Sequence, residues 1–161
     1  MSSQSPRVTS EQFRQAAGRF ATGITIATAL DPSGSPHGLT VNSFTSVSLE
    51  PPLVLFCLAH AAASRECFLT TKHFAINILA ADQRPLSERF ARKGHNRFEG
   101  VEWWKGVTGA PILGHVLAAM ECNVYQMITL GDHDVLAGQV VRLEVHEKKP
   151  LLYYASRYHQ F

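Results

Sequence analysis

The sequence predicts a mainly β domain with α-helical segments, built as a closed antiparallel barrel with short helices outside it. About six or seven segments have the alternating or continuously apolar character of strands, whereas roughly two or three short segments have helical spacing. Strands and helices do not alternate regularly along the chain, as they would in a parallel α/β sheet. The length of 161 residues fits one domain, and 45% hydrophobic residues against 17% charged ones suffice to fill a core.

The N-terminal residues predict a flexible tail followed by a helix. Residues 1–8 have no periodic pattern, so we expect the folded domain to span 9–161. Thr9 and Gln12 have the spacing of a capping box, in which each side chain satisfies a backbone amide of the other residue. Apolar side chains at helical spacing extend this helix to about Ala21.

The middle of the chain contains both strand-like and helix-like segments. The pair Pro51-Pro52 interrupts strand pairing because neither residue donates a backbone hydrogen bond. The run that follows is apolar on both faces, as a central strand is. Asp82 stands where it would cap a helix. We expect strands over 24–28, 38–47, 53–58 and 74–79, helices over 62–71 and 82–93, and a turn over 31–36.

The C-terminal part begins with a long irregular stretch and continues with two alternating strands. Residues 94–114 contain five glycines and two adjacent tryptophans, and loops of this length tend to be functional. We expect Trp103 and Trp104 to anchor this loop through hydrophobic contacts. The two strands flank Gly131-Asp132-His133-Asp134. One face of the first strand is expected to carry Met120, Cys122, Val124 and Ile128, and one face of the second Val141, Leu143 and Val145.

Composition and charge exclude several classes of protein. No apolar run approaches the ~20 residues of a membrane helix, and the N-terminus lacks the apolar stretch of a signal peptide. A formal charge of +2 without a Lys/Arg run predicts no nucleic-acid partner. Three cysteines without a CxxC pair predict buried free thiols in a reducing compartment and no structural zinc. We therefore expect a cytoplasmic protein that binds no membrane.

Several common binding and catalytic motifs are absent from the sequence. Without any G-x-G triplet, the chain lacks the dinucleotide-binding fingerprint, and it has no P-loop. Neither a G-x-S-x-G elbow nor an H-E-x-x-H helix occurs. A metal site at Asp132, His133 and Asp134 is not expected, because adjacent residues of a turn cannot all point at one ion.

Residues 40–52 are unusually polar for a strand, with five hydroxyl side chains and one amide within nine residues. One interpretation is an exposed strand face that tolerates Thr and Ser. The other is a polar edge that hydrogen-bonds a planar heterocycle and a phosphate. Alternation along a continuous strand would place Thr40, Asn42, Phe44 and Ser46 on one face, and Val41, Ser43 and Thr45 on the other.

At this segment the sequence resembles a known family, the flavin reductases with a split-barrel flavin-binding domain. Members of this family serve as the small reductase components of two-component monooxygenases. The resemblance depends on several blocks that occur in the same order and together cover nearly the whole chain. These blocks are residues 13–23, 40–52, 74–79 with Asp82-Gln83, 87–91, and Gly131-Asp132-His133 with Gly138.

The resemblance implies a homodimeric, Greek-key split β-barrel with short flanking helices that binds FMN or FAD. The implied activity is hydride transfer from NADH or NADPH to the flavin, and the implied partner is a separate oxygenase that receives reduced flavin. Hydride transfer between these two cofactors is their own chemistry, so the protein needs no nucleophile or strong base. Whether the flavin is held tightly or exchanges as a substrate stays open.

The resemblance also assigns candidate flavin-binding residues. A turn at a helix start would bring hydroxyl and backbone N–H groups to the flavin phosphate, which a helix N-terminus favours. The basic side chains Arg84, Arg89, Arg92, Lys93 and Arg97 either help to neutralise phosphates or form a solvated face. The candidate contacts are Thr40, Val41, Asn42, Ser43 and Ser46 on the strand, Ala61, Ala62 and Ser64 at the turn, and Arg89 with Phe90 beside the flavin.

A second set of residues is expected at the nicotinamide. The resemblance places His133 beside the nicotinamide, and it is our candidate catalytic residue, acting mainly to position the ring. Asp132 would hold its tautomer, and Gly131 lets the backbone come close. A C-terminal segment with Tyr154, Arg157 and Tyr158 is similar to one that closes over the pyridine nucleotide, although family members commonly have glycine at the position of Ser156.

Two other functions compete with this hypothesis. One is a flavin-binding carrier or sensor without catalysis, against which the predicted nicotinamide residues argue. The other is a split-barrel oxidase that acts on a small amine, which would need a further phosphate-binding Arg/Lys set that the sequence does not show.

Overall fold

The computed structural model describes residues 7–94 and 96–161, which form a mainly β structure with short helices, as predicted. Most of the predicted tail, residues 1–6, lies outside the described residues. The helices are α1 (Ser10–Ala17), α2 (Arg65–Thr70), α3 (Arg84–Ala91) and the 3-10 helix η1 (Ala81–Gln83). The strands are β1 (Thr22–Gly23), β2 (Thr25–Leu30), β3 (Pro36–Val41), β4 (Thr45–Leu49), β5 (Pro52–Ala59), β6 (His73–Ile78), β7 (Trp103–Lys105), β8 (Pro111–Leu113), β9 (Ala118–Leu130), β10 (His133–Val145), β11 (Leu151–Tyr154) and β12 (Arg157–Gln160).

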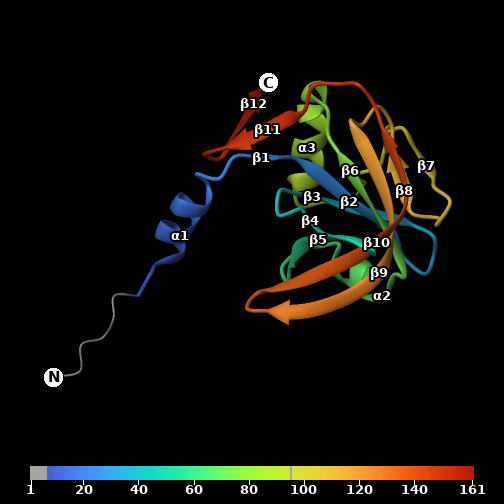
Figure 1. Cartoon of the computed structure of the whole chain (residues 1–161), viewed down its shortest axis with the longest axis horizontal. Coiled ribbons are helices and arrows are strands. Elements are labelled where there is room, and N and C mark those ends of the chain that lie inside the picture. Colours follow the sequence, from blue (N-terminus) through green and yellow to red (C-terminus); the bar gives the residue numbers. More distant parts are fainter. Residues whose placement is uncertain (1–6, 95) are drawn as a thin grey trace.

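Most strands belong to one strongly curved antiparallel sheet with the order β3-β2-β6-β9-β10-β5-β4 (Figure 1). Its edge strands, β3 and β4, are not hydrogen-bonded to each other in the part of the chain that the structure describes. The prediction of a closed barrel is therefore wrong, and the open sheet agrees with a split barrel. The chain passes from β3 to β4 through residues 42–44 without pairing the two strands.

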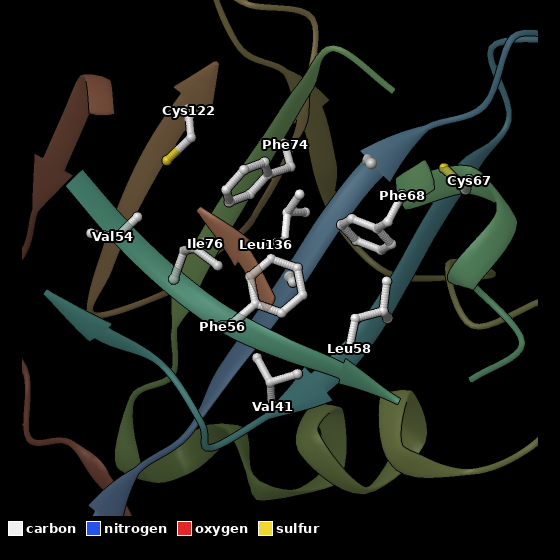
Figure 2. Close-up of a cluster of buried hydrophobic side chains, with 12 residues drawn as sticks. Val41, Val54, Phe56, Leu58, Cys67, Phe68, Phe74, Ile76, Cys122 and Leu136 are labelled. Carbon is white, nitrogen blue, oxygen red and sulfur yellow. The ribbon is translucent and has the colours of Figure 1, made fainter. Parts of the chain in front are cut away.

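The concave side of the sheet encloses the first of two hydrophobic clusters (Figure 2). Phe56 lies at its centre and makes edge-to-face contacts with Phe68 and Phe74, at ring-centroid distances of 5.6 and 5.5 Å. Gly138 on β10 is required here, because a Cβ at this position would lie 2.3 Å from the Phe74 ring. The second cluster joins α3 and β8 to β2, β6 and β9, and contains Phe90 and Leu113.

The first helix has the predicted capping box but is shorter than expected. Thr9 and Gln12 exchange hydrogen bonds at its start, and the helix ends at Ala17 rather than near Ala21. None of its residues is buried, and Phe13 and Phe20 are 66% and 79% exposed. Figure 1 shows α1 extending away from the barrel. Its apolar side chains therefore join neither of the two hydrophobic clusters that the described residues form.

The predicted strand over 38–47 is wrong, because it is two strands separated by residues 42–44. The expected alternation is lost at this break. Asn42 and Ser46 are exposed, whereas Phe44 packs against the first cluster. Thr40 donates to the backbone carbonyl of Ser87 in α3 at 2.6 Å, so its hydroxyl serves the packing of a helix.

Two other predicted helices also differ from expectation in their bounds. The helix predicted over 62–71 occupies only 65–70, and the one predicted over 82–93 consists of η1 and then α3. Asp82 does not cap α3. Instead, the Gln83 side-chain carbonyl accepts from the backbone N–H of Ala80 at 3.0 Å, and Pro85 stands in the first turn of α3, where no intrahelical donor is needed.

The last third of the chain contains more strand than expected. Strands β7 and β8 form a hairpin within the stretch predicted to be irregular. Trp103 packs edge-to-face on Phe98 at 5.6 Å, as anchoring predicts, whereas Trp104 is largely exposed. A β-bulge at Tyr125 reverses the alternation of β9, so Met127 packs on the core and Ile128 does not.

The cysteines are free, as predicted, and two of them are fully buried. Burial raises the pKa of the Cys67 and Cys122 thiols to about 12, whereas Cys57 is only half-buried. Within residues 7–94 and 96–161, no cluster of three metal-ligating side chains occurs. Among the same residues, no helix has both the length and the hydropathy needed to span a membrane.

Candidate functional site

Two turns that lie far apart in the sequence meet at one corner of the barrel. The first, residues 60–64, connects β5 to α2, and the second, residues 131–132, connects β9 to β10. The backbone N–H of His60 donates to the Asp132 carbonyl at 2.9 Å and joins them. The structure thus brings the predicted turn residues Ala61, Ala62 and Ser64 into the same region as Gly131, Asp132 and His133.

His133 is oriented in the way that the sequence predicts. Its Nδ1 lies 2.7 Å from the Asp132 carboxylate, and this hydrogen bond lowers the pKa of the Asp132 carboxyl. The contact holds the imidazole ring, whose side chain is 42% exposed. Asp134 does not share this role, because its carboxylate is buried and Asp132 is exposed. The Asp132 and Asp134 carboxylates therefore lie in different environments, one exposed and one buried.

The predicted flavin-binding strand divides into residues with structural contacts and residues with free side chains. Val41 is buried, and its carbonyl accepts from the Thr25 hydroxyl at 2.9 Å. The Ser43 hydroxyl accepts from the backbone N–H of Cys57 at 2.9 Å, which attaches residues 42–44 to β5. Together with Thr40, these residues shape the edge. Asn42 and Ser46 are the members of the set whose side chains remain exposed for a ligand.

Beside this edge lies a cleft of about 510 Å³. It is formed by the start of β3, the 60–64 turn and the loop after α3, and it is lined by Ser35, Pro36, His37, Gly38, Ala63, Ser64, Gly94, Asn96, Arg97 and Phe98. Strand β3 runs from this cleft to Val41, and the exposed Asn42 follows it. A volume of this size is within the range of small-molecule sites.

Arg97 supplies a positive charge to the cleft, and no carboxylate among residues 7–94 and 96–161 pairs with it. Its guanidinium donates to the carbonyls of Gly38 at 2.6 Å and Arg92 at 2.7 Å, and lies 3.3 Å from the Ser64 hydroxyl. The Nε atom is buried and has no hydrogen-bond partner among the described residues. Burial lowers the pKa of this group. A partly buried cation without a counter-charge is costly unless an anion joins it, so the arrangement favours an anionic ligand.

The structure contradicts the flavin contact predicted for Phe90, and it shows which contacts Arg89 and Ser64 make within the chain. Phe90 is 1% exposed and packs on Phe98, so it belongs to the core and has no surface for a ligand. Arg89 is exposed and donates to the carbonyl of Glu99 at 2.6 Å. Ser64 is buried, and its hydroxyl donates to the Gly38 carbonyl at 3.1 Å. Helix α2, which follows Ser64, has only six residues, so Arg97 is the stronger source of positive charge.

The C-terminal segment forms a hairpin of β11 and β12 that pairs with β1. Ala155 and Ser156 make its turn with φ of 49° and 61°, which explains why glycine would also suit the position of Ser156. The Tyr158 hydroxyl lies 2.9 Å from that of Ser87, and the Tyr154 hydroxyl accepts from Arg19 at 3.4 Å.

Figure 1 shows this hairpin and the β9–β10 turn on different sides of the molecule. The predicted nicotinamide residues Tyr154, Arg157 and Tyr158 are therefore not brought together with His133 within one chain.

Comparison with known proteins identifies the family. The sequence model of the flavin reductase like domain matches residues 17–161, which is most of the chain. The chain belongs to this family. It is 41% identical over 152 residues to the FMN reductase (NADH) SmoA of Agrobacterium fabrum, covering 94% of this chain and 86% of that protein. It is also 38% identical over 148 residues to the reductase subunit HsaB of a flavin-dependent monooxygenase of Rhodococcus jostii, covering 91% and 75%.

A solved structure agrees with the fold. The NADH:FAD oxidoreductase SgcE6 of Streptomyces globisporus, in complex with NAD and FAD fragments, superposes with a TM-score of 0.89 at 33% identity. The alignment covers 94% of this chain and 92% of that one. Two relatives from Rhizobium meliloti, each 46% identical, are longer, and the chain spans 42% and 56% of their lengths.

The sequence did not predict that Arg97 lies in the cleft, nor that His60 and Arg65 contact the buried Asp134. Arg97 was one of five basic residues, and its local sequence does not distinguish it from Arg89 or Arg92. Only the fold places it between β3 and the 60–64 turn.

Proposed function

We propose that this protein is an NAD(P)H:flavin oxidoreductase that transfers hydride from a reduced nicotinamide to FMN or FAD. The observation that carries the proposal is the membership of the flavin reductase family, together with 41% identity to an FMN reductase (NADH) over 94% of the chain. The uncompensated Arg97 in a cleft of about 510 Å³ supports the same activity, because both cofactors carry phosphate.

The flavin would bind along β3. Arg97 and the backbone of the 60–64 turn would hold its phosphate, and the segment from Asn42 to Ser46 would contact its ring. A bound flavin supplies an N5 atom that accepts hydride, and the protein's task is to hold the nicotinamide close to it. His133, oriented by Asp132, would contact the nicotinamide and limit its movement.

The activity is tested by following NADH absorbance with and without added FMN or FAD. Flavin-stimulated loss of NADH is expected. A protein that binds flavin but does not oxidise NADH would be a carrier or sensor, and a protein that binds no flavin would contradict the proposal altogether.

The phosphate site is tested with Arg97→Leu and two forms of the flavin. We expect the affinity for FMN to fall roughly tenfold, as for the loss of one charge-assisted contact, while the affinity for riboflavin, which lacks phosphate, is unchanged. Arg142→Leu, at an exposed arginine on β10, is the matched control. An equal loss for FMN and riboflavin would mean that Arg97 acts on the ring or the fold and not on the phosphate.

We further propose that the protein acts as a homodimer and passes reduced flavin to a separate oxygenase. The exposed apolar side chains of α1 and of the end of β10 support a second copy, because single chains rarely leave such faces uncovered. A second copy would also offer its β11–β12 hairpin to a site that one chain leaves incomplete. The resemblance to HsaB, a reductase subunit, supports an oxygenase partner. Three free cysteines support a cytoplasmic location.

A further inference from the structure

Asp134 is a buried carboxylate with three hydrogen-bond donors around it. Its side chain is 1% exposed. It accepts from Thr129 Oγ1 at 2.7 Å, from Arg65 Nε at 2.8 Å and from His60 Nε2 at 3.3 Å. The Thr129 hydroxyl, followed by Arg65, lowers the pKa of this carboxyl. The group is therefore a stable anion within the protein.

These donors come from two segments that lie far apart in the sequence. His60 and Arg65 stand at the two ends of the turn that connects β5 to α2, and Thr129 lies on β9 opposite Asp134. Asp134 itself follows His133 directly, and the backbone of His60 is bonded to Asp132. One carboxylate thus ties both ends of the 60–64 turn to the hairpin that carries His133.

In the proposed function, this connection joins the two cofactor sites, because the 60–64 turn would face the flavin phosphate and His133 would face the nicotinamide. We propose that Asp134 is a positioning residue that fixes the flavin-binding turn and the nicotinamide-binding turn relative to each other. The inference rests on the proposed function. It assigns to Asp134 no contact with either cofactor, and its effect passes through His60, Arg65 and the backbone of β10.

The substitution Asp134→Asn tests this role with little change of size. An amide cannot accept from all three donors, because one of its two polar atoms is itself a donor, and it leaves Arg65 without a neutralising charge. We expect the KM for flavin and the KM for NADH to rise together, each roughly tenfold, as for the loss of one hydrogen bond to a charged group. The kcat at saturation of both substrates should fall as well, because hydride transfer depends on the alignment of the two rings that these turns would hold.

The controls separate positioning from folding. Glu66→Gln removes an exposed carboxylate from α2, the helix that Arg65 begins, and should leave both KM values unchanged. A purely structural role of Asp134 would lower the melting temperature and the fraction of active enzyme without changing either KM. If Asp134→Asn does not fold, Thr129→Val removes a single donor at an exposed strand position and should raise both KM values in the same direction.

A readout independent of activity is the hydrogen exchange of the His60 backbone amide, which is bonded to the Asp132 carbonyl. It should exchange at least several-fold faster in Asp134→Asn. If the wild type is active and Asp134→Asn keeps both KM values, or changes only one of them, the positioning role is wrong and the proposed function is unaffected. If the wild type neither binds flavin nor oxidises NADH, the proposed function is wrong. If the His60 amide then also exchanges at the same rate in Asp134→Asn, Asp134 does not connect the 60–64 turn to the β9–β10 hairpin.

Discussion

The two halves of β10 lie in very different environments. In the first half, residues 133–139, the strand pairs with both β5 and β9, and Leu136 is fully buried. In the second half, pairing with β5 has ended, and Leu143 is 56% exposed. The comparison teaches that alternation in a strand predicts which side chains share a face, whereas burial depends on whether another layer covers that face.

The largest expected difference between the two halves of β10 is in the stability lost when a leucine is shortened to alanine. We expect Leu136→Ala to reduce the free energy of unfolding by about 2–5 kcal/mol, because it leaves a cavity beside Phe56 and Phe74. Within one chain, Leu143→Ala should cost less than about 0.5 kcal/mol, and a larger loss should appear only at protein concentrations where the proposed second copy covers this face. Urea denaturation at several protein concentrations measures both. A large loss in Leu143→Ala that does not depend on protein concentration would contradict the comparison.

A small residue in the first half is also expected to be indispensable. Gly138→Ala should destabilise the fold by about 1–3 kcal/mol, because the new methyl group would overlap the Phe74 ring and the Cys122 side chain. Val140→Ala, two residues further along the strand, should cost less, since Val140 is only partly buried. Equal losses in thermal or chemical denaturation would show that the Phe74 ring moves aside easily.

Substitutions of polar residues should likewise change the kinetic constants in the first half of β10 and not in the second. His133→Ala is expected to raise the KM for NADH roughly tenfold and to leave the flavin dissociation constant within about twofold, because His133 would contact only the nicotinamide. Arg142→Ala, which removes a long exposed ion pair with Glu144 at 3.9 Å, should change neither value. Steady-state kinetics and flavin titration provide the two numbers. A loss of flavin affinity with an unchanged KM for NADH would reverse the assignment.

The smallest expected difference is in the dependence of stability on pH. The folded-state pKa of Asp134 is lower than its unfolded value near 4, so its contribution to stability is complete above that value and is lost as the pH falls toward the folded-state pKa. Asp134→Asn should therefore lose less stability than the wild type as the pH falls below the unfolded-state pKa of an aspartate. Glu144→Gln, an exposed carboxylate in the second half, should leave the profile unchanged. Parallel acid profiles for wild type and Asp134→Asn would contradict the ionised state of Asp134.

Local sequence patterns determined the capping box at Thr9, the strand character of β5 and β6, and the pairing of His133 with Asp132. Each of these depends on residues within a few positions of each other or on a continuous apolar run. The ordered family blocks also predicted the split-barrel family before any contact was known.

The tertiary structure decided the features that join distant segments. Residues 42–44 interrupt a polar strand because Ser43 bonds to Cys57, and Arg97 rather than Arg89 enters the cleft because its loop folds against Gly38 and Ser64. Asp134 acquires its partners from β9, α2 and the turn before α2 only when these elements meet. Spacing along the chain cannot predict such contacts, since they depend on which strands become neighbours in the sheet and on where each one ends.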